Sequence, residues 1–214
     1  MLESKICGLT TAEAVAATVA GGARWAGFVF YPPSPRAVSP EQAAALAAGL
    51  GPDVGRVALL VDPDDTLLDR VLAALRPDLI QLHGSESPAR VAAIRERSAR
   101  PVMKAIKVAR PDDLAVVEGY LPVADRLLFD AKAPATLKDA LPGGNALSFD
   151  WRILAGRSWP RPWMLSGGLG AENLEEAVRI SGARAVDVSS AVESTRGVKD
   201  PQKVRAFLDR ARTL

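Results

Sequence analysis

Short apolar runs alternate with helix-like segments along this chain, and this alternation most constrains its fold. The runs are continuously apolar, which is typical of strands buried on both faces. We expect eight strands, at residues 4–7, 25–30, 57–61, 79–82, 102–107, 126–129, 163–165 and 185–188. Eight parallel strands with crossover helices close into a barrel, so the sequence predicts an α/β protein with a single-domain (β/α)8 TIM barrel.

Helix signals follow these strands. Thr10 lies three residues before Glu13 and can cap a first helix, and Ser39-Pro40, Ser87-Pro88 and Asp200-Pro201 are typical helix openings. The predicted helices cover residues 11–21, 39–49, 64–74, 87–97 and 200–212, with others from 111 and 172 and a short one near 150–151. The alternative fold, an open doubly wound sheet, needs a glycine-rich nucleotide turn after the first strand, and residues 7–10 do not form one.

Composition limits the class of protein. With 214 residues and 48% hydrophobic content, the chain can bury a sizeable core, and we expect one catalytic domain over residues 1–214. The net charge of +2, spread without a basic stripe, disfavours nucleic-acid and membrane-surface partners. One cysteine excludes an internal disulfide. We find no signal peptide and no membrane-spanning run, so a soluble, cytoplasmic protein is expected.

Polar side chains and glycines stand at the predicted strand ends, where (β/α)8 barrels carry their active sites. Cys7 ends the first strand, and alternation places it on the same strand face as Lys5. A lone cysteine is more often a small buried hydrophobe than a catalyst. The other candidates at this end are Arg36, Asp62, His83, Asp130, Gly167, Gly168, Asp187, Ser189 and Ser190.

Two strand ends favour a phosphate site. Glycines such as Gly167 and Gly168 let backbone N–H groups approach an anion, and helix N-termini add a favourable dipole. The alternative is that this glycine pair only makes a tight turn. Because a Walker-type loop is absent, a sugar phosphate is a better candidate than a nucleoside triphosphate.

Several motifs occur in a specific order along the chain. They include Lys5-Ile-Cys-Gly8, Ser34-Pro-Arg36, Gln81-Leu-His-Gly84, Phe129-Asp130, Gly143-Gly144, Ser166-Gly-Gly168, Asp187-Val-Ser-Ser190, Val192-Glu193 and Gly197-Val-Lys-Asp200. Together they resemble the phosphoribosylanthranilate isomerase family of tryptophan biosynthesis. The resemblance implies a (β/α)8 fold and an Amadori rearrangement of N-(5-phosphoribosyl)anthranilate to 1-(2-carboxyphenylamino)-1-deoxyribulose 5-phosphate, with no metal and no organic cofactor.

The resemblance also implies roles for residues. Cys7 would be the general base and Asp130 the general acid. Arg36 would bind the anthranilate carboxylate; the alternative is that it is only a solvated charge on a loop. Asp187 would lie near the ribose hydroxyls; the alternative is that it is a structural carboxylate. The remaining substrate-binding candidates are Gly144, Gly167, Gly168, Ser189 and Ser190.

The proposed chemistry imposes a condition on each catalytic group. Cys7 must be partly thiolate, which Lys5 or a substrate iminium would favour. Asp130 must hold a proton near neutral pH, which a desolvated mouth or a neighbouring carboxylate would favour. We expect His83 to pack or hydrogen-bond in the barrel mouth, and we leave it out of the catalytic pair.

Three residues depart from the family pattern. Ala146 and Ala191 stand where glycine is common, and Arg196 stands where proline is usual. If either alanine occupies a position of positive φ, its methyl group costs on the order of 1 kcal/mol.

Three rival functions remain open. The histidine-pathway aminoaldose isomerase uses paired aspartates, and indole-glycerol-phosphate synthase needs a lysine at a strand mouth, for which Lys104 and Lys107 are candidates. The third rival is a weakened barrel that only binds a phosphorylated ligand. We expect a small phosphorylated sugar as the partner, and a monomer or a homodimer.

Overall fold

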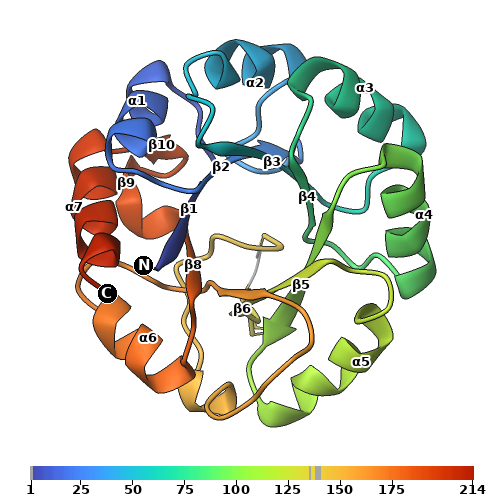
Figure 1. The fold of residues 1–214 in the computed structure, drawn as a ribbon, viewed down its shortest axis with the longest axis vertical. Coiled ribbons are helices and arrows are strands. Elements are labelled where there is room, and N and C mark those ends of the chain that lie inside the picture. The colour runs from blue at the N-terminus through green and yellow to red at the C-terminus, as the bar shows by residue number, and fades with distance from the viewer. Residues whose placement is uncertain (1, 135, 138–140) are drawn as a thin grey trace.

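The structure, a computed structural model, describes residues 2–134, 136–137 and 141–214. Eight parallel strands close into a barrel in the order β1 to β8, with helices around it (Figure 1). The predicted (β/α)8 barrel is therefore confirmed. The strands are β1 (Glu3–Cys7), β2 (Trp25–Phe30), β3 (Gly55–Leu60), β4 (Leu79–Leu82), β5 (Val102–Val108), β6 (Arg126–Ala131), β7 (Trp163–Leu165) and β8 (Ala185–Val188).

The α-helices lie outside the barrel (Figure 1), and the described residues also form three short 3-10 segments. The α-helices are α1 (Ala12–Ala20), α2 (Pro40–Ala47), α3 (Asp65–Leu75), α4 (Pro88–Ser98), α5 (Val117–Tyr120), α6 (Leu174–Ser181) and α7 (Pro201–Arg212). The 3-10 segments are η1 (Pro111–Val116), η2 (Trp151–Ile153) and η3 (Ser190–Val192). No described helix is long and apolar enough to cross a lipid bilayer.

Side-chain caps fix where the helices begin. Ser39, Ser87 and Asp200 accept hydrogen bonds from backbone N–H groups in the first turns of α2, α4 and α7, and a proline follows each cap. The predicted cap of α1 is wrong by one residue. Thr11 accepts the N–H of Ala14, whereas the Thr10 hydroxyl donates to the carbonyl of Gly197.

Two of the helix predictions are confirmed in position but differ in helix type. The helical connection after β5 begins at Pro111 as predicted, but it is mostly the 3-10 segment η1, and α5 adds a single turn. After β6, the short helix predicted near 150–151 is the 3-10 segment η2. Beyond β8 lies an unpredicted hairpin of β9 (Glu193–Thr195) and β10 (Val198–Lys199). Its strands are too short to produce a recognisable apolar pattern.

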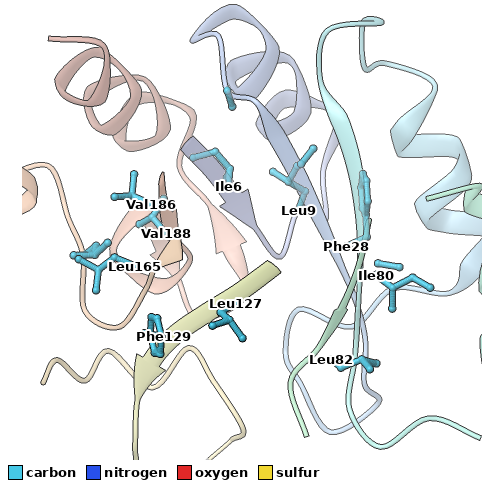
Figure 2. Packing of buried hydrophobic residues seen from close by; sticks show 14 of the residues in the cluster. Ile6, Leu9, Phe28, Ile80, Leu82, Leu127, Phe129, Leu165, Val186 and Val188 are labelled. Atoms are coloured by element: carbon cyan, nitrogen blue, oxygen red, sulfur yellow. The ribbon is translucent and has the colours of Figure 1, made fainter. Parts of the chain in front are cut away.

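The strands divide the core into an outer and an inner layer. Ile6, Phe28 and Leu127 belong to the large cluster packed between strands and helices, and Figure 2 shows part of it from close by. Side chains on the opposite strand face fill the barrel. The apolar side chains of this inner layer include Trp25, Val57, Leu79, Met103, Leu128 and Met164. Lys5 and Cys7 lie on this inner face, as predicted, with Ile6 on the outer one.

Candidate active site

A pocket opens at the carboxyl ends of the strands, and the space free of protein atoms there is about 760 Å³ with the open solvent at its mouth included. The walls include the nine residues to which the sequence analysis gave catalytic or substrate-binding roles: Cys7, Arg36, Asp130, Gly144, Gly167, Gly168, Asp187, Ser189 and Ser190. His83 also lines the pocket, whereas Asp62, the remaining strand-end candidate, does not line it and accepts the N–H of Ser85 at 2.8 Å. The fold therefore gathers residues from both ends of the sequence around one cavity.

The loop after β6 lies directly against the catalytic candidates. Residues 141–147 line the pocket. A Cβ on Gly143 would stand 2.7 Å from Nε2 of His83 and 3.0 Å from Oδ2 of Asp130. A Cβ on Gly144, whose φ is +71°, would stand 2.5 Å from Nη1 of Arg36. Glycine is needed at both positions because any side chain would push the loop off the site.

Cys7 lies beside a buried ion pair. Nζ of Lys5 is 2.8 Å from Oδ1 of Asp187, and the Ser166 hydroxyl donates to Oδ2 of the same carboxylate at 3.1 Å. Burial raises the pKa of the Cys7 thiol; Lys5 lowers it and Asp187 raises it, and the net pKa lies above the usual value. Lys5 thus acts in the expected direction, but burial outweighs it. The free site holds Cys7 mainly as a thiol.

The same ion pair affects Lys5 itself. Burial lowers the pKa of Lys5, but Asp187 and, after it, Cys7 raise it by more, so the pKa lies above its usual value. Lys5 is fully buried and stays protonated. It is therefore a fixed positive charge beneath Cys7.

Asp130 contacts an imidazole rather than a second carboxylate. Its Oδ2 lies 3.0 Å from Nε2 of His83, and its Oδ1 accepts the N–H of Ala131 at 2.9 Å. The other ring nitrogen of His83, Nδ1, lies 2.9 Å from Nε2 of Gln81. The expectation that His83 hydrogen-bonds in the mouth is confirmed. The side chain that contacts the Asp130 carboxyl group is therefore a histidine.

Arg36 is not a solvated loop charge, because only 3% of its surface is exposed. Its Nε and Nη2 donate to the Glu193 carboxylate at 2.6 and 3.0 Å, and Nη2 also reaches the Gly144 carbonyl at 3.2 Å. Lys199 donates to the same carboxylate at 2.6 Å. Burial raises the pKa of Glu193, but Arg36 and Lys199 outweigh it, and the net pKa is lowered. Burial also lowers the pKa of Lys199.

Glu193 and Lys199 are the residues that sequence analysis missed at this site. Glu193 belongs to the ordered motif set, yet no role was assigned to it. Lys199 donates weakly, at 3.3 Å, to Ser189, whose own hydroxyl donates to the Cys7 carbonyl at 3.0 Å. The two missed residues connect Arg36 to the strand that carries Cys7.

The glycine pair after β7 has the backbone conformation that favours glycine. Gly167 and Gly168 have φ values of +87° and +66°. The Asn173 side chain holds this loop by donating to the Gly168 carbonyl and accepting the Gly170 N–H, both at 2.9 Å. With Ser189 and Ser190, this loop forms one wall of the pocket.

Comparison with known proteins identifies the family. The family model described as N-(5'phosphoribosyl)anthranilate (PRA) isomerase matches residues 4–210. The chain belongs to this family of isomerases. A family member from Paramagnetospirillum magneticum, N-(5'-phosphoribosyl)anthranilate isomerase, is 56% identical over 211 residues, covering 99% of this chain and 97% of that protein.

Solved structures of the family have the same fold. Phosphoribosyl anthranilate isomerase from Thermotoga maritima is 35% identical, with a TM-score of 0.88 and full coverage of both chains. A phosphoribosyl anthranilate isomerase in complex with reduced 1-(o-carboxyphenylamino)-1-deoxyribulose 5-phosphate is 33% identical, with a TM-score of 0.83 and full coverage of both chains. The family's barrel therefore extends over this whole chain.

The departures from the family pattern have different structural consequences. Ala146 has a φ of +55°, so its methyl group is strained, whereas Ala191 lies in η3 and does not have a positive φ. Arg196 is exposed between β9 and β10. Lys104 is turned away from the mouth, with Nζ 2.8 Å from the Gly84 carbonyl and 2.7 Å from Oε2 of Glu86. It does not line the pocket.

Proposed function

We propose that this chain is one catalytic domain that converts N-(5'-phosphoribosyl)anthranilate into 1-(2-carboxyphenylamino)-1-deoxyribulose 5-phosphate, a step of tryptophan biosynthesis. The single observation that carries the proposal is that Cys7 and Asp130 line one pocket in a barrel of the isomerase family. These residues are the thiol and the carboxyl group that an Amadori rearrangement needs as base and acid.

Asp130 is the general acid of this mechanism. It gives a proton to the furanose ring oxygen, the C1'–O bond breaks, and the nitrogen lone pair forms an iminium with C1'. Asp130 is 4% exposed, so bulk water has little access to its proton. The loop with Gly143 and Gly144 lies against Asp130 on this side of the site. Its position supports a role for the loop in excluding water, so that the iminium is not hydrolysed.

Cys7 is the general base. Its thiolate removes the proton from C2', and the electron pair of the C–H bond moves toward the iminium to give an enolamine. Tautomerisation of the enolamine then gives the ketose. Asp130 loses one proton and Cys7 gains one, so the number of protons held by the protein is unchanged, and transfer of a proton from Cys7 to Asp130 restores the starting state. The high pKa of the free thiol means that the positive charge of the bound iminium is needed to favour the thiolate.

The remaining site residues bind the two anionic ends and the ribose. Arg36, held by Glu193, is the proposed partner of the anthranilate carboxylate. The backbone around Gly144, Gly167, Gly168, Ser189 and Ser190 is the proposed phosphate site. Asp187, fixed by Lys5 and Ser166, is the proposed acceptor for ribose hydroxyls. No role is assigned to a metal or an organic cofactor.

The test is a turnover assay with purified protein and N-(5'-phosphoribosyl)anthranilate, followed by the loss of substrate fluorescence. The proposal requires rapid loss of signal with saturation kinetics. The aminoaldose substrate of the histidine pathway and the substrate of indole-glycerol-phosphate synthase, offered in parallel, should turn over far more slowly. Binding of the first substrate without turnover would favour a barrel that only binds its ligand, and would refute the proposed function.

A further inference from the structure

Gln81 lies on the inner face of β4, where it is fully buried and in line with the proposed acid. Its amide Nε2 is 2.9 Å from Nδ1 of His83, and Nε2 of His83 is 3.0 Å from Oδ2 of Asp130. These contacts form a continuous chain from the amide through the imidazole to the carboxyl group. The amide oxygen, Oε1 of Gln81, is buried and has no hydrogen-bond partner among the described residues. Such an orphaned acceptor is costly in a folded protein.

The orientation of the amide determines which nitrogen of His83 carries a proton. When the NH2 end faces Nδ1, the neutral imidazole must hold its proton on Nε2 and donate it to Asp130, which is then an ionised acceptor. When Oε1 faces Nδ1, the imidazole must hold a proton there. Nε2 can then accept a proton from Asp130 or share one with it. Only the second arrangement stores the proton that the acid must deliver.

We propose that Gln81 is a positioning residue that keeps His83 and Asp130 loaded with this proton, by turning its amide oxygen toward Nδ1 of His83. A half-turn about the last side-chain bond exchanges the two ends of the amide, so that Oε1 accepts from Nδ1–H and the NH2 group takes the place of the oxygen. This inference rests on the proposed function, since it explains how the proposed acid is kept protonated.

Other charged groups also face this pair. Cys7 on β1, Asp187 on β8 and Arg36 after β2 line the same pocket, and Lys107 on β5 is the register partner of Asp130 on β6. These groups influence proton affinity, but none of them forms the recorded hydrogen bond to Nδ1 of His83. A change at residue 81 is therefore expected to act through the imidazole tautomer.

His83 is the only histidine of the chain, so its ring nitrogens can be observed without assignment. The first experiment is a pH titration by nitrogen NMR of protein labelled with 15N-histidine. In the native protein we expect the neutral ring of His83 to carry its proton on Nδ1, in contrast to the Nε2–H form common in free histidine. In Gln81→Met, which has similar length but no acceptor oxygen, the Nε2–H form should dominate. Gln202→Met, the same exchange at an exposed site on α7, should match the native spectrum.

The second experiment is the pH profile of turnover. Gln81→Met should lower kcat by about 10- to 100-fold with little change in KM, because an acid catalyst contributes on this scale or above it. The high-pH limb of the Gln81→Met profile should move to lower pH by about one unit. A shift of this size corresponds to a tenfold change in the proton equilibrium, which is the effect expected from losing one hydrogen bond. Gln81→Glu places a stronger acceptor against Nδ1 and should move the same limb up. A residue that only filled space would not produce opposite shifts.

The two experiments separate this inference from the proposed function. An Nε2–H tautomer in the native protein at every pH, unchanged by Gln81→Met, would overturn the role of Gln81 even if turnover is normal. Shifts of the pH limb in the same direction for both Gln81 variants would also overturn it. Lack of turnover by the native protein would refute the proposed function, while the NMR titration would still decide the tautomer.

Discussion

Replacing Lys5 by methionine tests how the buried ion pair supports Cys7. Lys5 is fully buried, and its Nζ is 2.8 Å from Oδ1 of Asp187. Methionine has similar length but removes the charge. In the described structure, Asp187 accepts side-chain hydrogen bonds from Lys5 and from the Ser166 hydroxyl. Lys5→Met leaves only the hydroxyl, at 3.1 Å. The variant therefore creates a buried carboxylate without a counter-charge.

The expected loss of stability follows from this contact. Removing one partner of a buried ion pair costs about 3–5 kcal/mol. Lys104→Met is a matched control, because Lys104 is also buried and pairs with Glu86 at 2.7 Å, away from the pocket. Both variants should lose about the same free energy of unfolding in urea titrations. Stability alone will therefore not distinguish them.

The reactivity of Cys7 should distinguish them. Among the influences on the pKa of Cys7, burial is the largest, the lowering by Lys5 is second, and the raising by Asp187 is third. Losing Lys5 should therefore raise this pKa even if Asp187 becomes protonated. A rise of one pH unit reduces the thiolate fraction about tenfold, and the rate of alkylation by iodoacetamide with it. Cys7 is the only cysteine, so the measured rate belongs to it alone.

Alkylation is measured on native protein, Lys5→Met and Lys104→Met at a series of pH values, in buffer without denaturant. Lys104→Met should follow the native profile, and Lys5→Met should be displaced to higher pH. Equal profiles for the two variants would refute the argument that Lys5 sets the ionisation of Cys7.

Three further predictions concern the backbone and the pH dependence of turnover. Ala146→Gly should raise the free energy of unfolding by about 1 kcal/mol, because glycine removes the strain of a side chain at a φ of +55°, and it should leave KM unchanged or lower it. The control is Ala99→Gly, at a φ of +50° outside the pocket, which should give the same gain in stability with unchanged KM. A loss of stability in both variants would contradict the strain argument. Gly167→Ala should lower the free energy of unfolding by about 1–3 kcal/mol and raise KM, since the new Cβ would lie 2.7 Å from the Ala131 nitrogen at a φ of +87°. Gly182→Ala is the control for backbone strain alone, because its φ is +73° and no atom lies within 4 Å of the new Cβ. An equal KM for the two variants would count against crowding at the site. The raised pKa of Cys7 means that the limb of the kcat/KM profile that titrates this thiol in the free enzyme should lie above the ordinary thiol value of about 8.5, while the corresponding limb of the kcat profile should lie at lower pH. A Cys7 limb of kcat/KM below about pH 8.5 would contradict the argument that burial dominates the ionisation of this thiol.

The barrel could be predicted from sequence because its strands are continuous apolar runs. The predicted strand 79–82 coincides with β4, and the last helix ends at Arg212 as expected. Local signals were less reliable where hydrogen bonding is non-local. Thr10 has the spacing of a capping residue, but its hydroxyl donates a hydrogen bond to the Gly197 carbonyl, and Thr11 caps the helix instead.

The site residues could be selected from sequence because parallel strands bring their carboxyl ends to one mouth. The contacts that tune those residues could not. Arg36 and Glu193 are 157 positions apart, and neither spacing nor composition indicates that they pair. The balance at Cys7 is also a property of the fold, because only the burial of the thiol shows that the nearby lysine is outweighed.

The most direct test of the account measures binding and turnover separately in Cys7→Ala and Asp130→Asn. Both variants should bind reduced 1-(o-carboxyphenylamino)-1-deoxyribulose 5-phosphate, a stable analogue of the product, within a few-fold of the native protein. Each should lose at least about 100-fold in kcat, the contribution expected of a general acid or base. Near-native turnover by either variant, with the analogue still bound, would contradict the central claim that this thiol and this carboxyl group transfer the protons.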